Sequence, residues 1–495
     1  MSYVKLKSLF REHSILNDIN SFLSWDMATY MPKNSRNQRV EQIKVLYEYK
    51  KNIFELIKQK ELFSKANHKV KKFDDQLNLE LMKKKYDYFH LIPFNLIKKK
   101  TVLSIECEGL WREARKKNNF NIVKNKLSDL VDVIKEESEI LSQKQEKSRY
   151  DCLLEKYDRS LNTNYLSIVF KEIEKFLKSY SKKIIFFGEN NNLNYKNDSL
   201  SEVEQIELSK TFMKKLGFNF NKGRIDKSLH PFCGGSSNDI RITTRYEAGN
   251  TFSCFDALMH ETGHALYEQG LPKKWLHQPI GTAGGMSLHE SQSLFIEMQI
   301  IKSLPASKLI ERVIRKNFKK TSPLWEFKSI YEHRNKVKKG FIRVNSDEFH
   351  YPLHIIHRFN IEKKIFSDSE KATSLPDIWN DEFKKIFNLK VPDDNHGCLQ
   401  DIHWFSGDFG YFPTYSVGAF IASQLKYKMK IDIKNIFELI EKGKFKPIIN
   451  WLRKKIHKNA NSYKIDDLLL KVTKEPLNIN YFKKHIIERY IEKKF

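Results

Sequence analysis

The residues best placed to do chemistry form the run His260-Glu261-Thr262-Gly263-His264. The preceding residues, 252–259, read as a helix, and Gly270 and Pro272 follow as terminators. On a helix, positions i and i+4 lie on one face, so both imidazoles can bind one cation. Glu261 would then project beside the metal and accept a proton from its water.

A third ligand is expected from a second helix further along the chain. Candidates include Glu290, in the run His289-Glu290-Ser291-Gln292-Ser293 of the periodic segment 287–302. The glycine-rich segment 281–285 would let this second helix pack back against the first. Two imidazoles and a carboxylate, with a fourth place open for water, suit zinc. The pattern therefore predicts a zinc-dependent hydrolase with His260, His264 and Glu290 as ligands and Glu261 as general base.

Other polar residues on these helices have weaker functional interpretations. Asp256 lies one turn before His260 and is expected to orient its imidazole, the alternative being a solvated carboxylate. Glu268, one turn after His264, has the same two interpretations. A rival metal face comes from three histidines at helical spacing that lack an accompanying glutamate, so we expect them to be a histidine cluster near the cleft whose hydrogen bonds are satisfied. They are His350, His354 and His357.

Charge and composition limit the function classes. The 88 basic residues exceed the 61 acidic ones, for a net charge of +27, but they are spread along the chain and indicate compositional bias. A basic nucleic-acid-binding protein with an incidental zinc motif is the alternative, and lysines clustered on one face would favour it. Five cysteines without a Cys-x-x-Cys spacing argue against disulfides and thiolate sites. With no signal peptide and no run of about 20 apolar residues, we expect a cytoplasmic protein without a membrane span.

Helical periodicity dominates the chain, as at Leu127, Leu130, Val131 and Ile134, and also over 46–56. Strand-like alternation is rare, and the best case is the segment 239–246 just before the metal motif. We therefore predict a mainly α protein with one small sheet near the active-site helix. The polar stretch 188–199 is the clearest loop. The chain is expected to form a single body over 1–495, with a candidate lobe boundary near 188–200.

Several motifs together resemble the thermostable carboxypeptidase Taq family, metallocarboxypeptidase family M32. The resemblance starts at HETGHALYEQG (260–270) and HESQS (289–293) and covers about the whole chain. The further motifs, in chain order, are WDMATYMP (25–32), WREAR (111–115), His230-Pro231-Phe232, DIRIT (239–243), GCLQDIHW (397–404) and FGYFPTY (409–415).

This resemblance implies a helical fold with a deep substrate groove, commonly as a homodimer. It also implies stepwise release of C-terminal residues from peptides, with zinc or sometimes cobalt and with broad specificity. A zincin-type endo-oligopeptidase on a similar helical fold is the alternative. An arginine placed for the substrate's terminal carboxylate would distinguish the two, because a guanidinium grips a carboxylate through two parallel hydrogen bonds.

The resemblance also suggests further site residues. Arg241 and Arg343 lie in family-like motifs and are candidates for binding the terminal carboxylate, with a structural ion pair as the alternative for each. Gln400 is expected to bind substrate, and His403 and Tyr415 are expected to stabilise the oxyanion or hold the peptide, with an aromatic core wall as the alternative.

The chain departs from the family pattern at several places. Leu294 stands where arginine is usual, Ile301-Lys302-Ser303 replaces Gly-Arg-Ser, and Ser346 stands where alanine is frequent. These differences leave the expected metal ligands intact and bear on local packing, the dimer contact and substrate preference.

Overall fold

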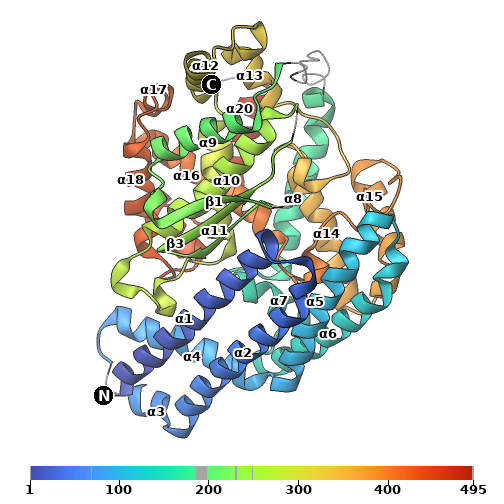
Figure 1. The fold of residues 1–495 in the computed structure, drawn as a ribbon, viewed down its shortest axis with the longest axis vertical. Helices are drawn as coiled ribbons and strands as arrows, with labels where there is room; N and C mark the ends of the chain where they lie inside the picture. The colour runs from blue at the N-terminus through green and yellow to red at the C-terminus, as the bar shows by residue number, and fades with distance from the viewer. Residues whose placement is uncertain are drawn as a thin grey trace. The chain divides into compact units, whose positions relative to one another are not determined.

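Residues 2–67, 70–185, 195, 198–228, 231–247 and 249–492 are described by the structure, which is a computed structural model. Most of the loop expected at 188–199 lies outside these described residues, as does His230. Within the described part of the chain, α-helices dominate and one three-stranded sheet is present (Figure 1). The predicted fold class is therefore confirmed.

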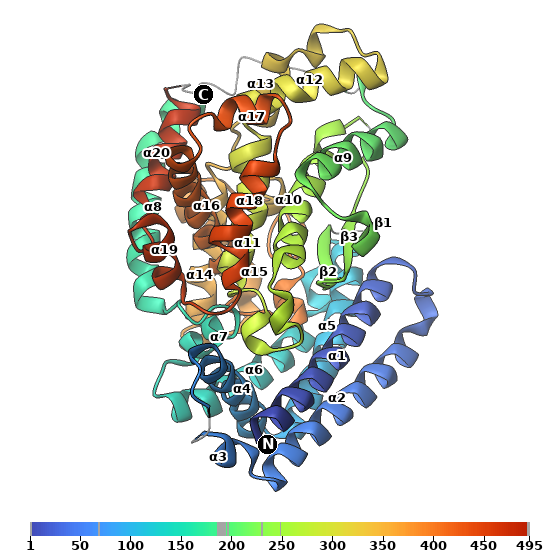
Figure 2. The ribbon, with the colours of Figure 1, turned by 90° about the vertical axis from the view of Figure 1, so that its left-hand side faces the viewer.

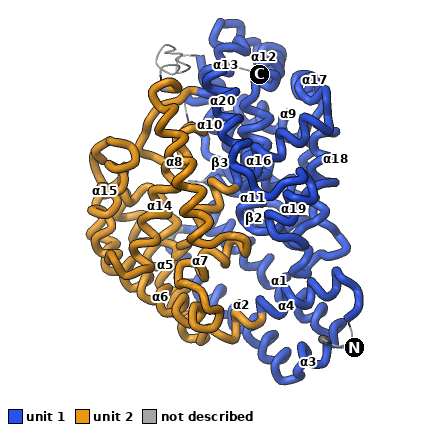
Figure 3. The backbone as a smooth tube through the Cα atoms, turned by 180° about the vertical axis from the view of Figure 1, so that it is seen from behind, with its two compact units in different colours: residues 1–85, 190–335, 418–495 blue, residues 86–189, 336–417 orange. Residues whose placement is uncertain are grey.

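Two compact units make up the chain (Figure 3). Unit 1 consists of residues 1–85, 190–335 and 418–495, and unit 2 of residues 86–189 and 336–417. The chain thus passes from one unit to the other four times. The metal motif and Glu290 both belong to unit 1, whereas Arg343, Gln400, His403 and Tyr415 belong to unit 2.

Unit 1 begins with a group of antiparallel helices, α1 to α4, in which α1 packs against α2 and α3. These are α1 (Ser2–Thr29), α2 (Arg36–Gln59), α3 (Leu62–Asn67) and α4 (Phe73–Leu91), the last of which runs into unit 2. The helix expected over 46–56 is present, but α2 buries Ile43, Phe54 and Ile57, and Tyr49 is 60% exposed.

The sheet of unit 1 has the strand order β1-β3-β2. Its strands are β1 (Gly223–Lys227), β2 (Phe232–Ser236) and β3 (Asp239–Thr244). β3 pairs parallel with β1 and antiparallel with β2, and it confirms the strand expected from 239, although it ends at Thr244. Ile240 and Ile242 of β3 are buried, and α10 (Thr251–Gly270) packs against this strand (Figure 2). The sheet thus supports the helix that carries the metal motif.

Several other elements of unit 1 pack on α10. α9 (Glu202–Leu216) contacts it and begins with a reciprocal cap, in which Ser201 and Glu204 each satisfy a backbone N–H of the other. α11 (Met286–Leu294) also packs on α10 and continues as a π-helix over Phe295–Ile301. The remaining helices are α12 (Leu304–Phe318), α13 (Phe327–Arg334), α16 (Pro413–Asp432, begun in unit 2), α17 (Ile436–Glu441), α18 (Lys446–Lys455), α19 (Ile465–Thr473) and α20 (Asn480–Tyr490).

Unit 2 contains helices and loops, with no strand among its described residues. Its helices are α5 (Phe94–Lys117), α6 (Lys124–Gln145), α7 (Arg149–Tyr157), α8 (Thr163–Ile185), α14 (Tyr351–Phe366) and α15 (Leu375–Phe387). The periodic residues Leu127, Leu130, Val131 and Ile134 are buried on α6, as their spacing predicts. A buried carboxylate, Glu362 of α14, accepts hydrogen bonds from Tyr150, Trp404 and the Gly410 backbone. It thereby anchors the loop that carries His403.

Candidate metal centre

Helix α10 presents His260 and His264 on one face, as their spacing predicts. Asn250 caps the helix by accepting a hydrogen bond from the Ser253 backbone N–H at 3.3 Å. The two imidazole ring centroids lie 5.0 Å apart. Glu261, between them in sequence, is 7% exposed and has no hydrogen-bond partner among the described residues. Its carboxylate is therefore left available for a substrate or a water molecule.

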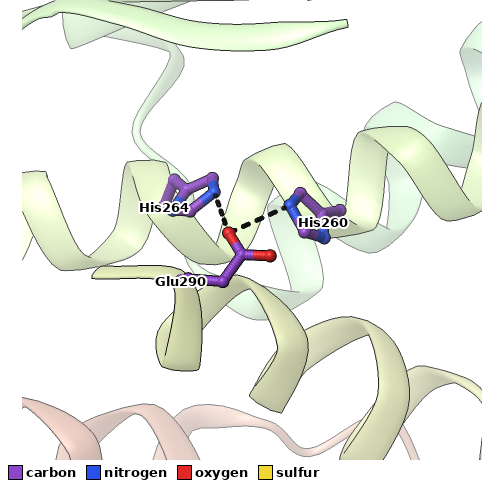
Figure 4. A group of neighbouring side chains, drawn as sticks. All are labelled: His260, His264 and Glu290. Atoms are coloured by element: carbon purple, nitrogen blue, oxygen red, sulfur yellow. Dashed lines mark ion pairs between the residues drawn. The ribbon is translucent and has the colours of Figure 1, made fainter. Parts of the chain in front are cut away.

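Glu290 of α11 completes the group (Figure 4). Its Oε2 atom lies 3.6 Å from His260 Nε2 and 3.2 Å from His264 Nε2. Its other oxygen, Oε1, is buried without a hydrogen-bond partner in the described structure. One ligand atom from each of the three residues lies within 4.8 Å of the others, and among the described residues no other group of this kind occurs. A buried carboxylate with one oxygen that lacks a hydrogen-bond partner, beside two imidazole nitrogens, fits a cation, so these residues form a His-His-Glu metal site.

The close approach of the two helices depends on glycine. A Cβ atom at Gly263 would lie 2.4 Å from the Gln292 carbonyl oxygen and 2.5 Å from Ser293 Cα. On the other side, a Cβ atom at Gly418 of α16 would lie 2.8 Å from Glu290 Cγ. The second helix therefore packs back on the first as expected, and it does so through Gly263 of the metal motif itself.

Each metal histidine is held by its second ring nitrogen. His264 Nδ1 lies 3.1 Å from the His289 carbonyl oxygen, and His260 Nδ1 lies 2.9 Å from Glu297 Oε2. When both Nδ1 atoms act as donors, the Nε2 atoms that face Glu290 are the ones available to a metal. Glu297 was missed by the sequence analysis, although it lies two helical turns after Glu290.

Asp256, which was expected to orient His260, has another partner. Its carboxylate accepts hydrogen bonds from Arg334 Nε at 3.1 Å and from Nη2 of the same guanidinium. The expectation that Asp256 orients His260 was wrong, because the folded chain brings the buried Arg334 of α13 to this carboxylate. Glu268 bonds His289 Nε2 at 3.1 Å, and the His289 ring stacks on His264 at 4.4 Å.

Burial and charge set the protonation of the centre. Burial raises the pKa of the Glu261 carboxyl to about 7, an effect that His260 opposes and Glu290 reinforces. Burial also disfavours the charged form of Glu290, but His260 and His264 outweigh it and hold the pKa of Glu290 below its usual range. Burial and His289 lower the pKa of His264 to about 4. Glu290 is therefore ionised and His264 neutral, which are the forms that bind a metal.

In unit 2, the structure brings together the other candidate residues as a polar and aromatic cluster. His403 Nε2 lies 3.0 Å from the Tyr415 hydroxyl oxygen. The Arg343 guanidinium carbon lies 4.9 Å from the centroid of the Tyr415 ring, and Arg343 Nη2 donates to Asp401 Oδ1 at 2.7 Å. Arg358 is fully buried and donates to the other oxygen of Asp401 at 2.8 Å. One carboxylate, that of Asp401, thus serves two guanidinium groups, and the Glu362 carboxyl also interacts electrostatically with Arg358.

Gln400 is engaged within this cluster. Its Oε1 atom accepts hydrogen bonds at 2.8 Å from the Arg343 backbone N–H and from Arg358 Nη2. Its amide nitrogen donates to the backbone carbonyls of Phe341, His396 and Gly397. Gln400 therefore positions Arg343 and the loop that precedes His403.

Arg241 has a different environment in unit 1. Its guanidinium donates to both oxygens of Asp239, at 2.7 and 2.8 Å, and lies over the rings of Phe22 and Trp25. Its side chain is 15% exposed, whereas that of Asp239 is 55% exposed. The charge of this arginine is thus balanced by a single carboxylate.

The rival histidine face of α14 is buried and does not form a metal group. His354 and His357 are fully buried, His357 Nε2 bonds the Trp379 carbonyl oxygen at 3.0 Å, and His350 Nδ1 bonds the Asp347 carboxylate. The three histidines are absent from the metal-binding groups found among the described residues. The histidines are buried together, but the expectation that they are satisfied was wrong, because four of their ring nitrogens lack a hydrogen-bond partner in the described structure: His350 Nε2, both nitrogens of His354 and His357 Nδ1. Separately, no helix in the described part of the chain is both long and apolar enough to cross a membrane.

The chain is similar to known proteins in sequence and in fold. The sequence profile of the family described as carboxypeptidase Taq (M32) metallopeptidase matches residues 5–490. The chain is 32% identical over 492 residues to carboxypeptidase 1 of Bacillus subtilis (strain 168), which covers 97% of this chain and 96% of that protein. It is 35% identical over 388 residues to thermostable carboxypeptidase 1 of Pyrococcus furiosus, covering 77% and 76% of the two chains. The structure of Trypanosoma cruzi metallocarboxypeptidase 1 superposes with a TM-score of 0.91 at 30% identity and covers 99% of both chains.

Proposed function

The chain belongs to the M32 (carboxypeptidase Taq) family of metallopeptidases, and we propose that it is a zinc-dependent carboxypeptidase that releases C-terminal amino acids from peptides with broad specificity. The observation that carries the proposal is the convergence of His260, His264 and Glu290 beside the unpartnered carboxylate of Glu261. Two imidazole nitrogens and one carboxylate oxygen are the donors that catalytic zinc commonly uses, and cobalt can substitute for it.

The proposed mechanism assigns a separate task to each residue. The three ligands would hold the metal, which when bound supplies Lewis acidity to the attacking water and the scissile carbonyl. Glu261 accepts the proton of the attacking water and later delivers it to the leaving amine nitrogen. Its burial supports this role, because removal from water raises the pKa of the carboxyl group in the metal-free site and so makes it a better proton acceptor.

Arg343 is our choice for the group that takes the free carboxylate of the substrate. Its carboxylate partner, Asp401, is shared with Arg358, so Arg343 has no carboxylate of its own among the described residues, and a substrate carboxylate would supply one. Arg241, by contrast, is already neutralised one-to-one by Asp239. We further propose that His403 and Tyr415, which are hydrogen-bonded to each other, stabilise the oxyanion or hold the peptide, and that Gln400 serves substrate binding through Arg343.

The proposal is tested by incubating the zinc-loaded protein with an unblocked peptide and following the products by mass spectrometry. A ladder of peptides shortened from the C-terminus supports a carboxypeptidase. Internal fragments, or equal cleavage of a peptide whose C-terminus is amidated, would instead indicate an endo-oligopeptidase. We also propose that the protein acts as a homodimer, as the family resemblance implies, and light scattering in solution tests this point.

A further inference from the structure

The carboxylate behind His260 belongs to a second ion pair. Glu297 lies in the π-helical segment Phe295–Ile301 that follows α11, and its side chain is 10% exposed. One of its oxygens, Oε2, lies 2.9 Å from His260 Nδ1. The other, Oε1, lies 2.9 Å from Lys302 Nζ, immediately after the π-helix. Glu297 therefore bridges a metal-binding imidazole and a lysine with separate oxygens.

Lys302 is in turn held in place by unit 1. Its side chain is 16% exposed, and its Nζ atom lies 4.0 Å from Asp256, the carboxylate that Arg334 binds. Arg334 also donates to the Ile301 carbonyl oxygen at 2.8 Å, at the end of the π-helical segment. π-Helical turns in proteins are rare and often occur at functional sites. Here the segment joins the metal ligand Glu290 to the Glu297–Lys302 pair.

The two metal histidines are therefore not equivalent. His264 has a neutral backbone carbonyl as its Nδ1 partner, whereas His260 has a carboxylate. A charged acceptor makes a stronger hydrogen bond to an imidazole N–H and raises the basicity of the opposite ring nitrogen. The strength of the His260–metal bond should therefore depend on Glu297. For His264, the Nδ1 partner in the described structure is the neutral carbonyl of His289.

We infer that Glu297 is a positioning residue that sets the metal affinity of the site through His260, and that Lys302 keeps its carboxylate in the bridging geometry. The inference rests on the proposed metal-dependent function. A purely structural ion pair would stabilise the fold of unit 1 without changing metal binding beyond that loss of stability. The two possibilities therefore differ in a measurable way.

The experiment compares the parent with Glu297→Ala, Glu297→Gln and Lys302→Arg. Glu382→Ala is the matched control, because it removes a similarly buried glutamate that pairs with Lys364 and Lys385 and belongs to unit 2. The zinc dissociation constant is measured by competition with a chelator, and the thermal midpoint of each metal-free protein is measured alongside. The absorption spectrum of the cobalt-loaded protein reports the ligand geometry independently of activity.

We expect Glu297→Ala to weaken zinc binding by about 10- to 100-fold, which is the usual effect of removing such a partner, and to alter the cobalt spectrum. Glu297→Gln should lose less zinc affinity, because its amide oxygen still accepts a hydrogen bond from His260 Nδ1. Lys302→Arg should bind zinc nearly as tightly as the parent. If Glu297→Ala lowers zinc affinity no more than Glu382→Ala does, the inference is wrong.

The inference and the proposed function can fail separately. A parent that binds zinc and yields a C-terminal ladder, with Glu297→Ala indistinguishable from the control, overturns only the role of Glu297. A parent that binds zinc in a Glu297-dependent way but yields internal fragments supports the role of Glu297 and contradicts the carboxypeptidase proposal.

Discussion

Gly263 of the metal motif lies directly against Gln292 of the next helix, so that a Cβ atom there would be 2.4 Å from the Gln292 carbonyl oxygen. The neighbour is backbone, which cannot rotate away as a side chain could. Gly263→Ala must therefore move α11, and Glu290 with it, away from the two histidines. We expect zinc affinity to fall by at least about tenfold and the protein to lose about 3 kcal/mol of stability, as measured by chelator competition and denaturant unfolding.

Gly340→Ala is the control for this substitution. A Cβ atom at Gly340 would meet no atom within 4 Å, so the change adds the same methyl group without a clash. Its zinc affinity should equal that of the parent. Normal zinc binding by Gly263→Ala would show that the helices can separate without disturbing the metal site.

The Glu261→Gln variant distinguishes the role of proton acceptor from the role of metal ligand. The amide cannot take a proton from water, but Glu261 is not one of the converging ligands, so the variant should retain zinc and lose turnover by at least about a hundredfold. His260→Ala and Glu290→Ala should lose both zinc and activity. Metal analysis and kcat together decide the point, because an empty site in Glu261→Gln, or near-normal kcat, would contradict the assignment.

The metal-free protein should also become less stable as the pH rises. Burial raises the pKa of Glu261 from 4.5 to about 7 in the folded state. The folded protein therefore holds this proton more tightly than the unfolded chain, and the resulting stability is complete below about pH 4.5 and lost as the pH rises through about 7. Removal of the carboxylate should then stabilise the metal-free protein at pH 8 by about 3 kcal/mol.

This pH effect is measured by comparing metal-free Glu261→Gln with the metal-free parent in urea at pH 5 and pH 8. The variant should be the more stable protein at pH 8, and the difference should be much smaller at pH 5. An equal difference at both pH values would mean that the Glu261 carboxyl titrates in its ordinary range in the folded protein.

The sequence predicts those parts of the metal site that depend on local helical spacing better than those that depend on tertiary contacts. The positions of His260, His264 and Glu261 follow from one helical turn, which local spacing determines. The prediction of Glu290 as a ligand requires a second motif and a glycine that allows close packing, and the sequence contains both. Glu297 could have been found in the same way, because it lies two turns after Glu290 on the same face. Local spacing also selected Asp256, and there it failed because a distant residue, Arg334, binds that carboxylate.

The unit 2 cluster could not have been derived from spacing. Arg343, Arg358 and Asp401 come from separate segments, and only the folded chain shows that two guanidinium groups share one carboxylate. Motif membership alone made Arg241 and Arg343 equal candidates. Their partners distinguish them, because Asp239 balances the charge of Arg241. The buried face of α2 likewise depends on tertiary packing, which buries Phe54 and leaves Tyr49 exposed.

Recognition of the substrate's free carboxylate gives the last prediction. Arg343→Ala should reduce kcat/KM for a free-acid peptide by at least about a hundredfold, because a buried carboxylate left without its charged partner costs about 3 kcal/mol or more. The fold should tolerate the change, because Asp401 keeps Arg358 as a one-to-one partner. Arg343→Lys should also be impaired, since an ammonium group cannot make the two-pronged contact.

Arg241→Ala is the comparison variant, and peptides with free and amidated C-termini are the paired substrates. The parent should prefer the free acid, Arg343→Ala should lose most of that preference, and Arg241→Ala should keep it. If Arg241→Ala alone removes the preference, the carboxylate binds in unit 1 and our choice of arginine is wrong. If the parent cleaves both peptides equally well, no cation of the protein recognises the terminal carboxylate. That result would contradict the carboxypeptidase proposal and favour the endo-oligopeptidase alternative.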